Sequence, residues 1–200
     1  MSVTILILAA GASSRMRGGD KCLEGVAGEP LLPRLTRFAL GTGCPVVVAL
    51  PPDRPLRAAA VAGLAVTRVT VPDPAQGMAA SLVAGLTAVP VGDAVMLLLS
   101  DLPEIMGDDL RAMLSAQAAH PDRILRGTAA DGTPGHPVIF PPDLRAELMA
   151  LQGDEGARSV IQRHKARLLP VPLPARHAVT DLDTPEEWAV WRAAKSRMAR

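Results

Sequence analysis

Apolar residues in this chain follow two patterns that alternate along its length. Continuous runs rich in leucine and β-branched residues are typical of strands that are buried on both faces. Segments with apolar residues every three or four positions are typical of helices. The continuous runs predict strands over Val3–Ala9, Pro45–Leu50, Ala65–Val71, Ala94–Ser100 and His136–Phe140.

The helical pattern accounts for most of the remaining chain. Thr184, Pro185 and Glu187 stand in the order of a capping box with proline at the first helical position, so the last helix has a defined start. Arg167–Leu173 predicts an edge strand, because its prolines cannot donate to a ladder. The predicted helices cover Pro30–Leu40, Arg54–Leu64, Gly77–Val89, Asp108–Ala119, Pro142–Leu151, Glu155–Lys165 and Thr184–Arg197.

This alternation of strands and helices predicts the fold class. We expect a single-domain, Rossmann-like, three-layer α/β/α fold with a mostly parallel sheet over residues 1–200. A chain of 200 residues fits one domain. Ligands of such sheets bind outside the carboxyl ends of the strands, so candidate functional residues are those that follow the strands.

Composition narrows the possible partners. The chain has 21 Lys and Arg against 20 Asp and Glu, so no overall charge attracts it to nucleic acid or a membrane. Its only aromatic residues are two Phe and two Trp, which disfavours a protein that stacks single-stranded bases. We therefore expect neither a nucleic-acid nor a membrane partner.

Cysteine usage and the first apolar run bear on location. Cys22 and Cys44 have no partners at zinc spacing, which favours free thiols and a cytoplasmic protein. The first run has no basic segment before it and is too short to span a bilayer, so we interpret it as a buried strand.

The loop after the first predicted strand is unusually long and basic. It extends for about twenty residues, from Ala10 to Glu29, whereas connections in such folds need only about 2–6. Gly11 permits close backbone approach to a ligand, successive loop N–H groups can form an anion nest, and Arg15, Arg17 and Lys21 add positive charge. The loop lacks GxxxxGK[ST] and GxGxxG, so it is neither a Walker A nor a dinucleotide motif. Composition alone leaves a solvated flexible loop as the alternative to a polyphosphate site.

The order of residues in the loop favours a polyphosphate site over a solvated flexible loop. LAAGASSRMRGGDK (Leu8–Lys21) resembles the LAAGxSxRMG…K signature of sugar-phosphate and cofactor nucleotidyltransferases. Within them the chain is most similar to the MobA-like branch, and there to the molybdenum cofactor cytidylyltransferases. Later family motifs have counterparts in order, in QGMAASLVAGL, LLLSDLPEI, GTPGHPVIFP, GDEGAR and TDLDTPEEW. The resemblance covers nearly the whole chain and implies a fold of the nucleotide-diphospho-sugar transferase type.

The resemblance also implies an activity and its central residues. A Mg²⁺-dependent enzyme would transfer a nucleoside monophosphate from a nucleoside triphosphate to a phosphate acceptor and release pyrophosphate. Arg15, Lys21 and Asp101 would be catalytic. Asp101 follows the most apolar predicted strand, where a carboxylate can hold Mg²⁺ beside a triphosphate, although the role of a turn cap is the alternative. Asp181 fits the second metal position better than Asp183, although both can serve the next helix N-terminus.

Two further groups of residues come from the resemblance. Ser81 would reach the base, although close helix–sheet packing also explains a small residue there. The acceptor would meet Gly135, His136 and Pro137, for which a structural loop is the alternative. Arg158 is a further candidate for contact with an acceptor phosphate. The nucleotide would contact Leu8, Ala9, Ala10, Gly11, Ser13, Arg15, Lys21, Pro72, Gly77 and Ser81.

The base and the acceptor are less well defined. Alanine at Ala10 favours CTP in the resembling enzymes, but one methyl group decides only about 1–3 kcal/mol, so GTP stays open. Molybdopterin is the expected acceptor, with a molybdoenzyme as a further partner. Sugar phosphates and other small phosphates remain alternatives. A nucleotide- or cofactor-binding chaperone is the non-enzymatic alternative, but it could dispense with Asp101, so the presence of both Lys21 and Asp101 favours catalysis.

Overall fold

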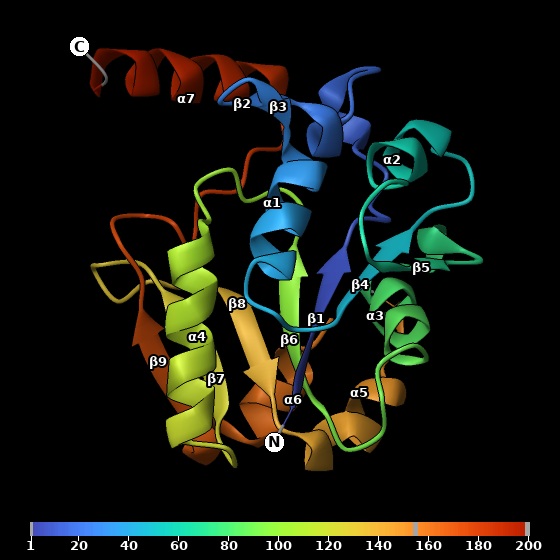
Figure 1. Cartoon of the computed structure of the whole chain (residues 1–200), viewed down its shortest axis with the longest axis vertical. Coiled ribbons are helices and arrows are strands. Elements are labelled where there is room, and N and C mark those ends of the chain that lie inside the picture. Colours follow the sequence, from blue (N-terminus) through green and yellow to red (C-terminus); the bar gives the residue numbers. More distant parts are fainter. Residues whose placement is uncertain (1, 154–155, 199–200) are drawn as a thin grey trace.

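A seven-stranded sheet runs through the middle of the computed structural model, which describes residues 2–153 and 156–198 (Figure 1). Its strand order is β5-β4-β1-β6-β8-β7-β9. β8 is antiparallel to both of its neighbours, and the other adjacent strands pair in parallel, which confirms the mostly parallel sheet. The strands are β1 (Val3–Leu8), β4 (Val46–Leu50), β5 (Thr67–Thr70), β6 (Ala94–Leu99), β7 (Ile124–Thr128), β8 (Pro134–Phe140) and β9 (Leu168–Pro172).

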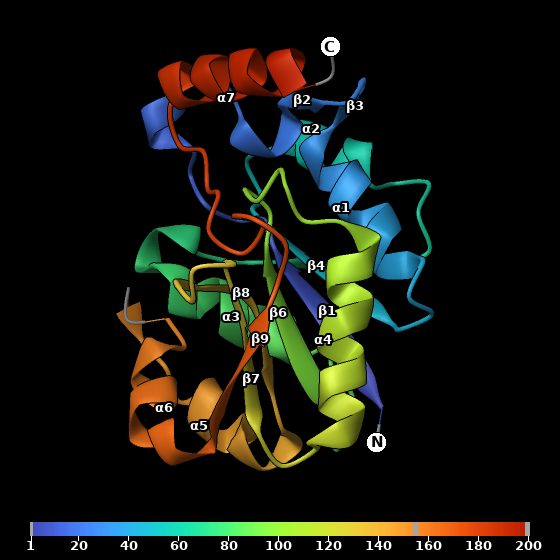
Figure 2. The ribbon, with the colours of Figure 1, turned by 90° about the vertical axis from the view of Figure 1, so that its left-hand side faces the viewer.

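Helices cover both faces of this sheet, as Figure 2 shows. α1 (Leu31–Leu40) and α4 (Gly107–Ala119) lie on one face. α3 (Met78–Leu86), α5 (Arg145–Met149) and α6 (Arg158–Arg163) lie on the other, which gives the predicted three layers.

Three further elements lie near the end of the sheet at which β1 finishes. α7 (Pro185–Met198) crosses that end (Figure 1). Near it lie α2 (Pro55–Ala60) and a small hairpin of β2 (Gly25–Val26) and β3 (Glu29–Pro30). Single 3₁₀ turns occur at Ser14–Met16, Lys21–Leu23, Pro74–Gln76, Pro142–Leu144 and Lys165–Arg167.

The hydrophobic core lies in two parts, one on each face of the sheet. Ile5 and Ile7 of β1 pack in the part that includes α1 and α4. Leu6 and Leu8 point the opposite way, into the part formed with α3, α5 and α6. Every residue of β1 is buried, which explains its continuous apolar sequence.

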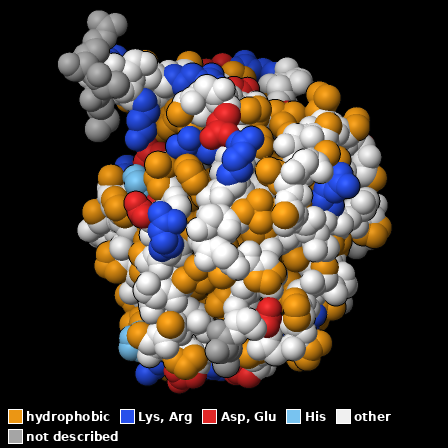
Figure 3. Space-filling model, in the orientation of Figure 1, with side chains coloured by type: hydrophobic (Ala, Val, Ile, Leu, Met, Phe, Trp, Pro, Cys, Tyr) orange, Lys and Arg blue, Asp and Glu red, His pale blue; other side chains and the backbone are white. Residues whose placement is uncertain are grey.

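The surface reflects the balanced composition. On the face shown in Figure 3, charged side chains are interspersed with apolar ones. In the described part of the chain, no helix combines the length and the apolar character needed to cross a membrane.

One strand and several element boundaries differ from the predicted ones. The sequence does not predict β7, because Arg126 and Gly127 interrupt the apolar run that marks the other central strands. α2 ends at Ala60 rather than Leu64, and the predicted helix over Pro142–Leu151 is divided into a 3₁₀ turn and the short α5. The helix predicted over Glu155–Lys165 is α6, with Asp154 and Glu155 outside the described residues.

Gly135 is required by packing at the start of β8. A Cβ atom on Gly135 would lie 1.9 Å from the carbonyl oxygen of Ala178 and 2.6 Å from its carbonyl carbon. The same carbonyl accepts a hydrogen bond from the backbone N–H of His136 at 2.8 Å. Because both obstacles are backbone atoms, a side chain here can be accommodated only if the chain moves.

We therefore predict that Gly135→Ala lowers the free energy of unfolding by about 3 kcal/mol, since a methyl group must displace backbone. Gly63→Ala is the matched control, because a Cβ on Gly63 meets nothing within 4 Å. Urea unfolding of both variants and the parent measures the difference. Equal stability of the two variants would show that the approach to Ala178 is not tight.

Candidate nucleotide-binding and catalytic site

A cavity of about 400 Å³ lies at the carboxyl ends of β1 and β6. The sequence-predicted loop forms one wall, and the segment that leads into α3 forms another. Both meet where parallel sheets of this kind bind ligands. The lining residues are Leu8, Ala10, Gly11, Ala12, Lys21, Cys22, Pro74, Ala75, Gly77, Met78, Ser81, Leu99, Ser100 and Asp101.

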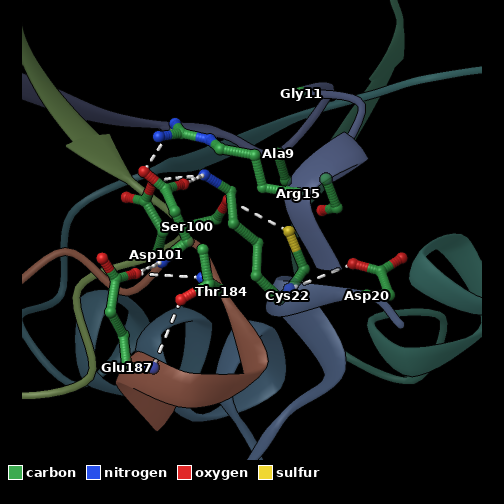
Figure 4. A network of polar contacts seen from close by, with 12 residues as sticks. Ala9, Gly11, Arg15, Asp20, Cys22, Ser100, Asp101, Thr184 and Glu187 are labelled. Carbon is green, nitrogen blue, oxygen red and sulfur yellow. Dashed lines mark hydrogen bonds and ion pairs between the residues drawn. The ribbon is translucent and has the colours of Figure 1, made fainter. Parts of the chain in front are cut away.

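Lys21 is the centre of the charged network in this cavity. Its Nζ atom lies 2.6 Å from Oδ2 of Asp101 and 2.8 Å from Oδ1 of Asp183. Arg15 reaches the other oxygen of Asp183 at 2.6 Å. Figure 4 shows the side chains of Arg15 and Asp101 directed towards this network. The three predicted catalytic residues, Arg15, Lys21 and Asp101, thus come together. Lys21 pairs directly with Asp101, and Asp183 joins Arg15 to Lys21.

The protonation state of Lys21 is fixed by these neighbours. Its side chain is 17% exposed, and this burial alone would lower its pKa. The carboxylates of Asp101 and Asp183 outweigh that effect and raise the pKa of Lys21 above its usual 10.5. Lys21 therefore carries a full positive charge at neutral pH.

Asp101 retains a free oxygen that suits a metal ion. Its Oδ2 binds Lys21, while its Oδ1 is buried and has no hydrogen-bond partner. A buried carboxylate oxygen without a partner is costly, and a hard cation would satisfy it. Among the described residues no cluster of three His, Cys, Asp or Glu side chains is arranged to hold a metal. A cation here would therefore take most of its ligands from phosphate and water, as Mg²⁺ commonly does.

Asp181 and Asp183 occupy different positions beside Asp101. Asp183 takes both cations, Lys21 and Arg15, in ion pairs. Burial of the Asp181 carboxylate, followed by the negative charges of Asp101 and Asp183, raises the pKa of Asp181. The three carboxylates are therefore close enough to repel one another, and a cation would relieve that repulsion. The assignment of Asp181 as the second metal-side residue stays a prediction.

A buried arginine that the sequence reasoning missed holds the loop in place. The side chain of Arg57, from α2, has no exposed surface. Its Nη1 donates to the carbonyl oxygens of Ala9 at 2.7 Å and Gly11 at 2.8 Å. Its Nη2 donates to Oγ of Ser13 at 2.9 Å, and its Nε to Oδ2 of Asp20 at 2.7 Å. One guanidinium therefore binds four points along the loop.

Asp20 links Arg57 to the turn that contains Lys21. Its Oδ2 binds Arg57, while its Oδ1 accepts the backbone N–H of Cys22 at 3.0 Å and so caps the 3₁₀ turn Lys21–Leu23. On the other side of that turn, Cys22 Sγ lies 3.2 Å from Oγ of Ser100, the residue before Asp101 (Figure 4). The turn that carries Lys21 is thus fixed to both α2 and the end of β6.

No local signal in the sequence singles out Arg57. It lies in an alanine-rich helix, where an arginine is most often exposed. The acceptors it binds are backbone carbonyls and short side chains, whose positions depend on the folded loop. Only Asp20, a carboxylate in a basic loop, hints that a partner is needed.

Other predicted residues divide between the cavity and its surroundings. Gly77 and Ser81 line it, and Gly77 has a φ of 95°, which glycine adopts without strain. Ala9 and Ser13 serve the loop's structure through Arg57. Pro72 is exposed and lines a separate depression with Gln76 and Ala80.

The predicted acceptor residues lie on the other side of the site. His136 lines a second cavity, which shares Leu8, Met78 and Leu99 with the first. Gly135 and Pro137 are buried beside it.

Comparison with known proteins places this geometry in a family. Residues 5–168 match the model of the MobA-like NTP transferase domain. The chain belongs to the MobA-like NTP transferase family. It is 34% identical over 197 residues to a molybdenum cofactor guanylyltransferase of Bradyrhizobium sp. (strain ORS 278), with 92% of this chain and 89% of that protein covered.

Solved structures of other proteins share this fold. The chain superposes on Rv0371c of Mycobacterium tuberculosis H37Rv with a TM-score of 0.83 and 26% identity, covering 96% of this chain and 98% of that one. A complex of Rv0371c with manganese has a TM-score of 0.78 at 24% identity and covers 95% of this chain and 97% of that one. The predicted family and fold are therefore confirmed.

We predict that Arg57→Ala destabilises the protein by about 3–5 kcal/mol, because it leaves the Asp20 carboxylate and the loop carbonyls without their buried partner. Arg68→Ala is the control, since Arg68 is exposed on β5. Chemical denaturation followed by circular dichroism measures both. An Arg57→Ala protein as stable as Arg68→Ala would rule out the loop-holding role.

Proposed function

We propose that this MobA-like chain transfers a nucleoside monophosphate from a nucleoside triphosphate to a molybdopterin-type phosphate acceptor. The observation that carries the proposal is the position of Lys21 between two carboxylates at the cavity, while Asp101 keeps one oxygen free. The curated relative's name, molybdenum cofactor guanylyltransferase, supports the acceptor. A sugar phosphate or another small phosphate is the alternative acceptor, and a molybdoenzyme is the expected recipient of the product.

The reaction needs positioning and charge stabilisation more than covalent help. An oxygen of the acceptor phosphate attacks the α-phosphorus of the nucleotide. A new P–O bond forms as the bond from the α-phosphorus to the bridging oxygen breaks, and pyrophosphate leaves with that electron pair. The acceptor phosphate is already largely ionised at pH 7, so it requires no strong general base.

Residues of the loop perform most of this work. The backbone around Gly11 faces the cavity, and Lys21 and Arg15 supply positive charge for the triphosphate and for the charge that develops on the leaving group. On nucleotide binding, phosphate oxygens would take over from the carboxylates as partners of Lys21.

A divalent cation, with Mg²⁺ as our expectation, would neutralise phosphate charge and hold the reacting oxygens in line. Asp101 would hold it through the free Oδ1, with Asp181 as the second carboxylate. Rv0371c, a protein of the same fold, has been solved in complex with manganese, which is in line with a divalent ion.

Two observations bear on the base. The name of the curated relative favours GTP. The methyl group of Ala10, which is buried and lines the nucleotide cavity, favours the smaller cytosine by reducing the space beside the base. Guanylyl transfer is the first candidate and cytidylyl transfer the second.

Lys21→Ala should reduce turnover about 10²–10³-fold, because the main fixed positive charge beside the phosphates is lost. Lys165→Ala, at an exposed lysine of a distant 3₁₀ turn, should leave turnover unchanged. Pyrophosphate release with Mg²⁺, a molybdopterin-type acceptor and each of GTP, CTP, ATP and UTP measures this. If the protein binds nucleotide but releases no pyrophosphate with any of the acceptor phosphates tested, the cofactor-binding chaperone is indicated instead.

Replacing Ala10 by glycine tests the base. Ala10→Gly should raise the ratio of kcat/KM for GTP to that for CTP by about 10-fold or more, since a methyl group in a pocket decides about 1–3 kcal/mol. The same pyrophosphate assay with each nucleotide gives the ratio. An unaltered ratio would mean that Ala10 does not contact the base.

A further inference from the structure

A second, more enclosed cavity of about 240 Å³ lies between the sheet and α6. It adjoins the nucleotide cavity across Leu8, Met78 and Leu99, which line both. Most of its remaining wall is apolar, formed by Leu82, Leu97, Val138 and Ile161. A ligand in it would therefore lie next to a nucleotide in the first cavity.

Two arginines enter this apolar cavity from different elements. Arg126 comes from β7 and Arg158 from the start of α6. Arg126 donates through Nε to the carbonyl oxygen of Gly135 at 3.1 Å. Among the described residues neither arginine forms an ion pair with a carboxylate, in contrast to Arg15, Lys21 and Arg57 around the nucleotide cavity.

The two positive charges are close enough to affect each other. Burial, followed by the charge of Arg158, lowers the pKa of Arg126. Arg126 is partly buried and Arg158 is exposed, and within residues 2–153 and 156–198 no carboxylate pairs with either of them. An anion between the two guanidinium groups would relieve their repulsion. Because arginine presents several N–H groups in a planar fork, the chemistry matches a phosphate or carboxylate.

His136 adds a polar atom to the same cavity. Its Nδ1 is buried and has no hydrogen-bond partner. Burial, with the nearby charge of Arg126, lowers the pKa of His136 to about 4, so the ring is neutral at pH 7. A neutral imidazole leaves the positive charge to the arginines and offers one hydrogen bond to an uncharged part of a ligand.

We propose that Arg126 and Arg158 bind the phosphate of a phosphomonoester whose uncharged body lies against the apolar wall and hydrogen-bonds to His136. This inference rests on the proposed nucleotidyl transfer, for which it supplies the acceptor subsite and adds Arg126 as a binding residue. A phosphomonoester carries nearly two negative charges at pH 7, which two arginines balance.

Inorganic phosphate is the probe, titrated calorimetrically into Lys21→Ala protein so that the nucleotide loop contributes little. Arg158→Gln in that background should raise the dissociation constant for phosphate about 10- to 100-fold, because the loss of one hydrogen bond between charged groups weakens affinity by about that factor. Arg126→Gln should do the same. Arg163→Gln is the matched control, since Arg163 lies on the same helix and pairs with Glu147.

Nucleotide binding by Arg126→Gln and Arg158→Gln, made with Lys21 intact, checks that both proteins fold. Arg158 is exposed on α6, so its variant tests the site even if the replacement of Arg126 disturbs β7. Phosphate affinity that is the same in all variants, or absent before either arginine is replaced, would overturn the subsite. Phosphate binding that depends on both arginines, in a protein that releases no pyrophosphate with any nucleotide, would keep the subsite and reject the proposed transfer.

Discussion

The buried guanidinium of Arg57 is the interaction on which the geometry of the site depends. A loop rich in glycine and serine has many accessible conformations, and ordering each residue costs about 1–2 kcal/mol. Arg57 offsets that cost by joining Ala9, Gly11, Ser13 and Asp20 to one rigid, planar group. The loop can therefore keep small residues where a ligand approaches closely and still have a defined shape.

The charged side chains at the site form ion pairs with one another, and a bound substrate can take the place of either partner. Lys21 and Arg15 are satisfied by Asp101 and Asp183 in the structure described, so their positions are set in advance. A triphosphate binds together with a cation. Its phosphate oxygens can replace the carboxylates as partners of Lys21 and Arg15, and the cation can replace these side chains as the partner of the carboxylates. The protein thus reorganises little on binding, which is the condition under which electrostatic stabilisation is effective.

Sequence patterns anticipated the central strands, the three layers and the family, because those follow from long apolar runs and from an ordered set of motifs. They missed β7, whose Arg126 and Gly127 serve a cavity and a close backbone approach rather than the core. They also missed Arg57, whose role exists only once the loop has folded. Lys21 and Asp101 can be found from the sequence because both follow strands in recognisable motifs. The sequence favours Asp181 over Asp183, and it does not show that Asp183 pairs with both Lys21 and Arg15. The roles in catalysis assigned to these residues remain predictions.

The reversed direction of β8 has a consequence for how this fold can diversify. Because β8 begins where β6 ends, His136 lies at the same edge of the sheet as Asp101 but comes from a separate hairpin with β7. Apart from Asp181 and Asp183, the nucleotide half of this end of the sheet is built by residues before Leu102, whereas His136, Arg126 and Arg158 come from residues after Ala119. Changes in the β7–β8 hairpin and α6 can therefore alter which molecule is modified while the machinery that activates the nucleotide stays intact, as if two modules shared one sheet.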